Sequence, residues 1–161
     1  MNSHHRPDLT RALAALERGE VIVFPTETLY GLGADALNFS AVDKIFQLKG
    51  RDPNNPFPVL IADRAMLDGL VADVSPLAEK LMQHFWPGPL TLVLSAPPAM
   101  VAAVTGGRGT VGVRVPAHPV TRALCAAVGW PLTATSANRS GAPATDRPDG
   151  HRRAAAAGSL R

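Results

Sequence analysis

Cysteine is almost absent from this sequence, and its scarcity excludes several kinds of site. Cys125 is the single cysteine, so the chain forms no intrachain disulfide and no CxxC zinc site. A lone cysteine without a visible catalytic partner is typically a small buried residue of the core. We therefore expect Cys125 to be buried, with a catalytic thiol as the minority alternative.

Aromatic residues and long hydrophobic runs are also scarce. Aromatic side chains make up 5% of the chain, which leaves few rings for stacking on nucleic-acid bases. No apolar run reaches the roughly 18 residues of a membrane span. The segment Met1–Arg6 lacks the apolar core of a signal peptide. The sequence therefore predicts a cytoplasmic protein.

The common nucleotide-binding and hydrolase motifs are missing as well. There is no Walker P-loop, and the glycines at 106, 107 and 109 do not form the dinucleotide fingerprint. No HExxH, EF-hand, GxSxG or kinase signature occurs. A nucleotide would have to be held by some other arrangement.

The residues that are present suffice for one folded domain. The chain has 161 residues, of which 46% are hydrophobic, so it can bury a core. Its formal net charge is +3. That balance suits an anionic partner such as a nucleotide or RNA, although charge alone decides little.

Helical and strand patterns alternate along the chain. Helices are predicted after Asp8, after Ser40 as N-cap, from about Arg64, after Ser75 and Pro76, and through the stripe Val120, Leu124 and Val128. Leu77, Leu81 and Phe85 recur at helical spacing in the fourth of these helices. Strands are predicted at 21–24, 58–61, 90–94, 111–115 and 132–134. This alternation predicts an α/β domain (α+β by some schemes) with a twisted mixed β-sheet and packed helices.

The first of three polar segments runs from Pro25 to Gly33 and reads as neither helix nor strand. Thr26, Glu27, Thr28 and Tyr30 offer hydroxyls and a carboxylate there. Loops at the ends of strands commonly carry binding residues. A capped turn is an equally good interpretation.

The second segment, 49–56, places two cations two residues apart at a helix end. Lys49 can act as a point charge and Arg51 as a bidentate fork, so together they could clasp a polyphosphate. The alternative is that basic residues near a helix C-terminus only complement the helix dipole.

The third segment, 135–141, follows the last predicted strand. Its hydroxyl and amide side chains could bind a phosphate, a ribose or a carboxylate, or they could form a turn that caps a following helix. Arg114 is a further candidate, because strand alternation points it away from Val113 and Val115. A surface salt bridge is its alternative role.

Taken together, these segments resemble one family. The resemblance rests on Phe24–Gly33, Lys49-Gly50-Arg51, Asn55-Pro56, Trp86-Pro87-Gly88-Pro89-Leu90-Thr91, Thr110 through Arg114-Val115-Pro116, and Ser136-Ala137-Asn138 with Ser140 and Gly141. In this order and spacing the segments resemble the YrdC-like threonylcarbamoyl-AMP synthases, over roughly residues 8–145. Each motif is weak alone, but six in order are very specific.

The resemblance implies a transferase (a nucleotidyltransferase) of tRNA processing. Its substrates would be L-threonine, bicarbonate or CO2, and ATP with Mg²⁺, and its products threonylcarbamoyl-AMP and pyrophosphate. Threonylcarbamoyl-transferase proteins would then modify tRNA. Because the substrates supply both the nucleophile and the electrophile, the protein mainly positions them and neutralises charge.

The resemblance also implies roles for individual residues. Lys49 and Arg51 would be the catalytic cations. The ATP contacts would be Lys49, Arg51, Asn55, Thr110, Ser136 and Asn138. The threonine contacts would be Thr26, Thr28, Tyr30, Arg114 and the backbone near Ala134. No metal ligand of the protein itself is expected, since phosphate and water can hold the Mg²⁺.

Family members continue beyond the Ser-Ala-Asn segment with a Ser-Thr-Val motif and a late Arg-Gly pair, which this sequence lacks. We therefore expect residues 1–145 to form a YrdC-like domain that is incomplete at its C-terminal end. Residues 146–161 are expected to be an atypical, disordered tail, and the chain to be a poor synthase.

Two other functions compete with this one. A carbamoyl-adenylating domain of the hydrogenase-maturation type shares the motifs, but its companion zinc segments need more cysteines. A non-catalytic module that binds double-stranded RNA or tRNA would suit the charge, but not the scarcity of aromatic residues.

Overall fold

The protein is described by a computed structural model that defines residues 9–98, 102–138 and 140–141. The Asp8 cap and the 146–161 tail predicted above lie outside these residues. The described part contains five α-helices: α1 (Leu9–Glu17), α2 (Phe39–Lys49), α3 (Pro76–Phe85), α4 (Ala102–Thr105) and α5 (Pro119–Val128). A short 3₁₀ helix, η1, spans Arg64–Leu67. Within these residues no helix is long and apolar enough to cross a membrane.

Seven short strands form two sheets. They are β1 (Ile22–Phe24), β2 (Gly31–Gly33), β3 (Val59–Leu60), β4 (Leu92–Ser95), β5 (Thr110–Arg114), β6 (Leu132–Thr133) and β7 (Thr135–Ser136). The first sheet has the order β1-β2-β7 and is antiparallel. The second has the order β4-β5-β3-β6, in which only β3 and β5 run parallel.

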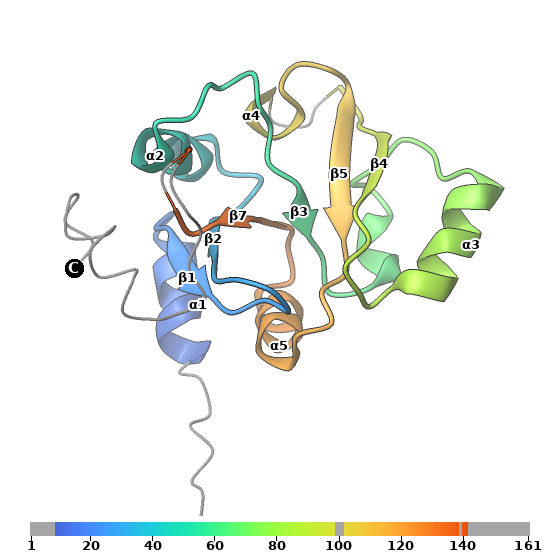
Figure 1. Cartoon of the computed structure of the whole chain (residues 1–161), viewed down its shortest axis with the longest axis horizontal. Coiled ribbons are helices and arrows are strands. Elements are labelled where there is room, and N and C mark those ends of the chain that lie inside the picture. The colour runs from blue at the N-terminus through green and yellow to red at the C-terminus, as the bar shows by residue number, and fades with distance from the viewer. Residues whose placement is uncertain (1–8, 99–101, 139, 142–161) are drawn as a thin grey trace, which may run out of the picture.

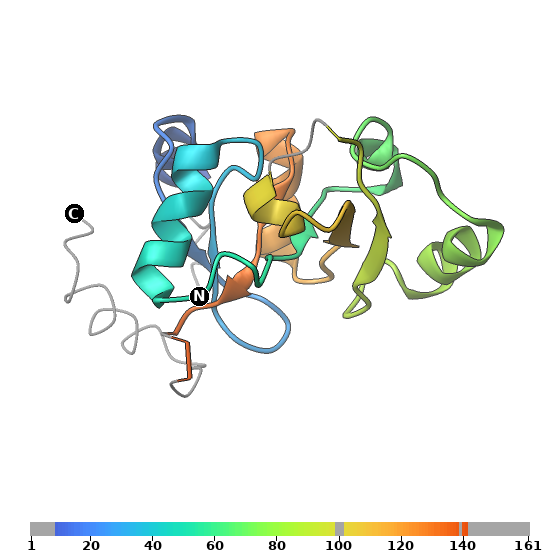
Figure 2. The same cartoon turned by 90° about the horizontal axis from the view of Figure 1, so that it is seen from above.

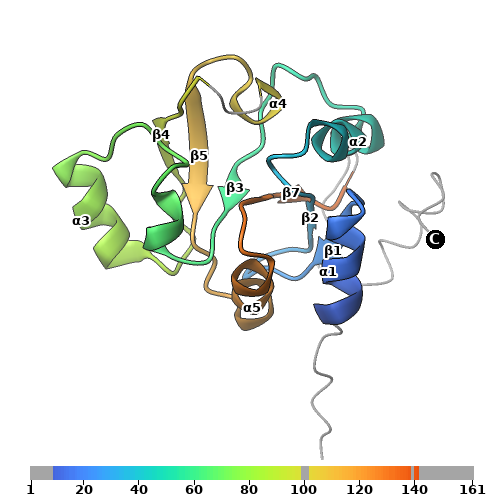
Figure 3. The same ribbon diagram turned by 180° about the vertical axis from the view of Figure 1, so that it is seen from behind.

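The two sheets are joined where β6 runs into β7. The backbone N–H of Thr133 donates to the carbonyl of Ala34 at 2.9 Å, and Asp35 forms a bridge with Leu132. Helices α1 and α5 lie side by side, and α3 lies at the far end of the molecule from α1 and α2 (Figures 1, 2 and 3). The predicted class, a twisted mixed sheet with packed helices, is confirmed.

Two apolar clusters hold the sheets and helices together. The larger packs the buried face of α2 against β3 and β5, with Ile45 and Val113 completely buried. The rings of Phe46 and Phe57 lie 4.4 Å apart within it. The smaller cluster joins α1, α5 and β6, and includes Cys125. Cys125 is completely buried, so the prediction of a buried cysteine is confirmed, and burial raises the pKa of its thiol to about 12.

Helix α2 begins earlier than predicted. Asn38, not Ser40, is its N-cap, and the Asn38 side chain accepts from the backbone N–H of Ala41 at 3.2 Å. Asparagine caps as well as serine does, and the prediction of Ser40 is wrong because the cap lies two residues upstream. The helix ends at Gly50, whose φ of 59° suits the left-handed turn that starts the 50–56 loop.

The 25–33 segment is partly a strand, contrary to the prediction. Gly31–Gly33 pairs with β1 and β7. The Phe24 ring packs over this strand, and a Cβ atom on Gly33 would come within 2.5 Å of that ring and 2.6 Å of the Thr133 carbonyl oxygen. Close packing therefore requires glycine at position 33. The turn preferences of the neighbouring residues do not reveal this requirement.

Helix α3 begins as predicted, with the Ser75 side chain accepting from Ala78 N at 3.2 Å. Its buried residues are Ala78 and Met82. Leu77 and Phe85, which suggested the helix by their spacing, are 67% and 46% exposed. Helix α5 ends at Gly129 with φ 78°, as its sequence predicted.

Candidate functional site

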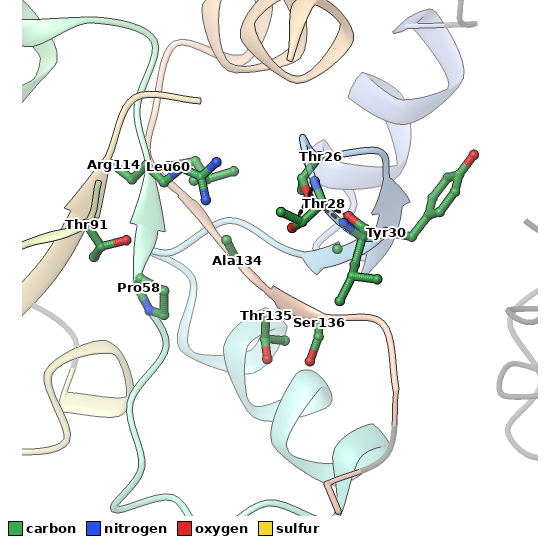
Figure 4. Close-up of a pocket in the computed structure, with 12 residues that line it drawn as sticks. Thr26, Thr28, Tyr30, Pro58, Leu60, Thr91, Arg114, Ala134, Thr135 and Ser136 are labelled. Atoms are coloured by element: carbon green, nitrogen blue, oxygen red, sulfur yellow. Dashed lines mark hydrogen bonds between the residues drawn. The ribbon is translucent and has the colours of Figure 1, made fainter. Parts of the chain in front are cut away.

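A pocket of about 170 Å³ opens where the loop between β1 and β2 faces the end of β5 (Figure 4). All five residues predicted to bind threonine line it: Thr26, Thr28, Tyr30, Arg114 and Ala134. They come from three stretches of chain that are far apart in the sequence. The walls are completed by Leu29, Gly31, Pro58, Leu60, Thr91, Thr135 and Ser136.

The β1–β2 loop is shaped by Thr26. Its hydroxyl donates to the Leu29 carbonyl and accepts the backbone N–H groups of Thr28 and Leu29 at 3.3 and 3.2 Å. The interpretation as a capped turn is thus correct for this residue. The Thr28 hydroxyl, 3.4 Å from that of Thr26, lies toward the pocket, whereas the Tyr30 ring points away from it (Figure 4).

Arg114 faces the β1–β2 loop across the pocket, on the half-buried face of β5. Strand alternation puts Val113 and Val115 in the core and Arg114 on the opposite face, as predicted. Its Nε donates to the Gly88 carbonyl at 2.8 Å, and its Nη2 donates to the Glu27 carboxylate. Arg114 is therefore held by an ion pair and still lines the pocket.

The Trp-Pro-Gly-Pro turn supplies the support for Arg114. The N–H of Gly88 donates to the Val115 carbonyl at 2.9 Å, and its own carbonyl receives Arg114. A Cβ atom on Gly88 would come within 2.2 Å of the Phe85 carbonyl oxygen. Only glycine fits this turn, so the motif places an acceptor beside Arg114.

Lys49 lies next to this pocket, at the C-terminal end of α2. It is 4% exposed, and its Nζ donates to the carbonyls of Ser136 and Asn138 at 2.6 and 2.7 Å and to the Asn138 side chain at 3.2 Å. The Lys49 carbonyl accepts from Ser140 N at 3.0 Å. Burial and the positive charge of Arg51 lower the pKa of Lys49 to about 8. Lys49 thus ties α2 to Ser136, Asn138 and Ser140.

Arg51 is engaged within its own loop. Its Nε donates to the Asn55 carbonyl at 3.0 Å, and its guanidinium lies 5.0 Å from the centre of the Phe57 ring. The structure therefore brings the predicted ATP contacts together in two groups. Lys49, Ser136 and Asn138 form one, and Arg51 and Asn55 form the other.

Thr110 stands apart from both groups, at the start of β5. It pairs with Ser95 and lies about 13 Å from Arg114 along the strand, at ~3.3 Å per residue. The loop before it is linked to the 54–56 segment, because the Arg108 guanidinium donates to the Asn54 carbonyl at 3.2 Å. Thr110 itself does not line the pocket.

Some pocket residues were not predicted. Thr91 belongs to the Trp-Pro-Gly-Pro-Leu-Thr motif, and Pro58 is the first residue of a predicted strand. The sequence patterns could therefore have pointed to both residues. Leu60 had no local signal, because only the tertiary structure shows which face of β3 meets the cavity. Among the residues that the structure describes, no three His, Cys, Asp or Glu side chains gather as a metal site.

The geometry agrees with a comparison of the sequence against known families. The family described as "Telomere recombination" (Sua5/YciO/YrdC) matches residues 14–157. The chain belongs to this family. The pocket described above is therefore best compared with members of this family.

Several relatives have been named by function. The chain is 47% identical over 142 residues to the threonylcarbamoyl-AMP synthase of Bacillus subtilis, covering 88% of this chain and 41% of that protein. It is 46% identical to the synthase of Thiobacillus denitrificans, covering 80% and 68%. The chain thus spans about two fifths of the length of the first relative and about two thirds of the second.

A solved structure gives the same fold. Pyrococcus abyssi Sua5, in a crystal structure complexed with L-threonine, matches with a TM-score of 0.86 and 41% sequence identity. The match covers 90% of this chain and 43% of that one. The resemblance to YrdC-like proteins inferred from the sequence motifs is confirmed.

Proposed function

We propose that this chain carries the active site of a threonylcarbamoyl-AMP synthase. The observation that supports the proposal most directly is the pocket between Thr28 and Arg114. At about 170 Å³ it is smaller than the roughly 300–1,000 Å³ clefts that hold drug-sized ligands. It suits an amino acid, with Arg114 as partner for the carboxylate and Thr28 for a side-chain hydroxyl.

The reaction needs positioning rather than a strong base. The threonine ammonium first releases a proton to water. The free amine nitrogen then bonds to the carbon of CO2 and loses a second proton to form a carbamate; with bicarbonate, a water molecule leaves instead. A carbamate oxygen then attacks the α-phosphorus of ATP, the bond to the bridging oxygen breaks, and pyrophosphate leaves. Charge accumulates on the phosphates during this step, so cations beside them lower the barrier.

Ser136 connects the two halves of the proposed site. It lines the threonine pocket, and its carbonyl accepts from Lys49. ATP placed along Ser136, Asn138 and Lys49 would bring its α-phosphate close to a carbamate held by Arg114. The β- and γ-phosphates would then extend toward Arg51, Asn55 and Thr110.

Magnesium would enter with ATP as part of the substrate. The donor set of Lys, Arg, Ser and Asn in this region does not resemble a dedicated magnesium cage, and phosphate oxygens and water are sufficient ligands. Transfer of the threonylcarbamoyl group to tRNA by partner proteins in the cytoplasm completes the proposal. The names of the relatives support it more than they support a non-catalytic RNA-binding module or a hydrogenase-maturation domain.

The test is release of pyrophosphate from ATP. It should require L-threonine, bicarbonate and Mg²⁺ together, and mass spectrometry should detect threonylcarbamoyl-AMP in the same mixture. Arg114→Ala should abolish the threonine-dependent release of pyrophosphate, and Arg18→Ala, which alters an exposed arginine just after α1, should not. If the parent chain released pyrophosphate at the same rate with and without threonine, the proposal would be refuted.

A further inference from the structure

Glu27 is the one charged side chain of the 25–33 segment, and neither the motifs nor the pocket lining gave it a role. Its carboxylate reaches across from the β1–β2 loop to the end of β5. One oxygen accepts from Arg114 Nη2, and the other accepts from the backbone N–H of Ala117. The Arg114 and Glu27 side chains are 18% and 22% exposed, so the pair is partly shielded from water.

Arg114 uses two of its three guanidinium nitrogens in contacts with the described residues. Nε donates to Gly88 O at 2.8 Å, and Nη2 donates to Glu27. Nη1 makes no hydrogen bond with the residues that the structure describes. Its two hydrogens therefore stay available for a substrate carboxylate.

We propose that Glu27 is a positioning residue that fixes which edge of Arg114 meets the carboxylate of the amino-acid substrate. This inference rests on the proposed function. Without Glu27, the guanidinium could turn about its last bonds and Gly88 alone would restrain it. The Glu27 pair also ties the loop that carries Thr28 to the strand that carries Arg114, so it sets the distance between the two substrate contacts.

The same contacts separate Glu27 from acid–base chemistry. Both of its oxygens already accept hydrogen bonds. Burial alone would raise the pKa of Glu27, but the backbone N–H groups of Glu27 and Ala117, together with Arg114, bring it below its ordinary value. Glu27 stays ionised at neutral pH and holds Arg114, and it does not accept a proton from the threonine ammonium.

The test compares two ligands that differ only at the carboxylate. Calorimetry would measure the binding of L-threonine and of L-threoninol, in which an alcohol replaces the carboxylate, to the parent chain, Glu27→Ala and Glu27→Gln. We expect Glu27→Ala to reduce the preference for threonine over threoninol by about tenfold, which is less than the roughly hundredfold loss that a 1 Å misplacement can cause. Glu27→Gln keeps the shape without the charge and should lose less, about threefold.

Glu20→Gln is the matched control, because it removes an exposed ion pair with Arg18 far from the pocket. Glu20→Gln should prefer threonine over threoninol by the same factor as the parent chain. Equal losses for both ligands in the Glu27 variants would mean a general structural role and overturn the inference. If Glu27→Ala does not fold, the preference of Glu27→Gln for threonine over threoninol tests the inference by itself. A folded parent chain that binds neither ligand would overturn the proposed function, and this inference with it.

Discussion

The pocket around Arg114 and the end of α2 around Lys49 each place a cation beside the 134–138 segment, but the two cations are engaged differently. Arg114 is held through Nε by Gly88 and through Nη2 by Glu27, and it lines a cavity. Lys49 is nearly fully buried and directs its ammonium group at three oxygens of Ser136 and Asn138.

The difference shows that a charged residue in a binding motif can act in two ways. If Arg114 binds the substrate carboxylate as proposed, its contacts with Gly88 and Glu27 already hold it in place, so little has to move when the carboxylate arrives. Lys49 stabilises the segment that carries Ser136 and Asn138, and a phosphate that reaches it has to replace carbonyl acceptors. We therefore expect substitutions at Lys49 to affect stability and ATP use together, and substitutions at Arg114 to affect threonine alone.

The largest effect is expected for Lys49→Ala. It should raise the barrier to pyrophosphate release by about 2–4 kcal/mol. It should also lower the free energy of unfolding by about 2 kcal/mol, because buried carbonyls lose a charged donor. Turnover assays and denaturant titration would measure the two losses.

Two further variants sharpen this prediction. Lys44→Ala is the matched control, since Lys44 also lies on α2 and donates to a carbonyl, that of Gly19, at 2.7 Å. It should leave turnover unchanged. Arg51→Ala should impair turnover with a smaller loss of stability, because Arg51 is more exposed than Lys49. If Lys49→Ala folds and turns over like the parent chain, both roles of Lys49 are wrong.

Arg114→Lys should weaken L-threonine binding by ten- to a hundredfold, about 1.4–2.7 kcal/mol, because an ammonium cannot form the bidentate contact. ATP binding should change little. Calorimetry with each ligand separately would measure both affinities, with Arg18→Lys as a control at an exposed arginine. Equal weakening of threonine and ATP would contradict the division of the site into two parts.

Thr28→Val should have a smaller effect, about 1 kcal/mol, because it removes one neutral hydrogen bond. The loss should appear for L-threonine and be absent for L-2-aminobutyrate, which lacks the side-chain hydroxyl. Thr10→Val, at an exposed position on α1, should bind both ligands like the parent chain. A valine variant that loses affinity for both amino acids equally would show that Thr28 only shapes the loop.

A further prediction concerns pH and Lys49. Because its pKa in the folded protein is about 8 and its ordinary value is higher, the unfolded chain binds more protons above pH 8. Stability should therefore rise with pH in this range. The thermal midpoint of the parent chain relative to Lys49→Met should increase between pH 8 and pH 10. If the difference in thermal midpoint between the parent chain and Lys49→Met stays constant or falls from pH 8 to pH 10, Lys49 keeps its ordinary pKa.

Several features followed from short-range patterns. Ser75 before Pro76 predicted the start of α3, and Gly129 predicted the end of α5, because caps depend on residues within one turn of the helix. The position of Arg114 on the opposite face of β5 from Val113 followed from strand alternation. The five proposed threonine contacts came from family motifs, and the structure places them around one pocket.

The sequence by itself determined the class of fold, the family and the identity of the polar segments, since these depend on periodicity and on motifs read in order. Only the tertiary structure decided how the charges are used. Glu27 and Arg114 are 87 residues apart, and Lys49 and Ser136 are also 87 apart. No local pattern links such partners, because pairing across the fold depends on which strands become neighbours and which side chains become buried.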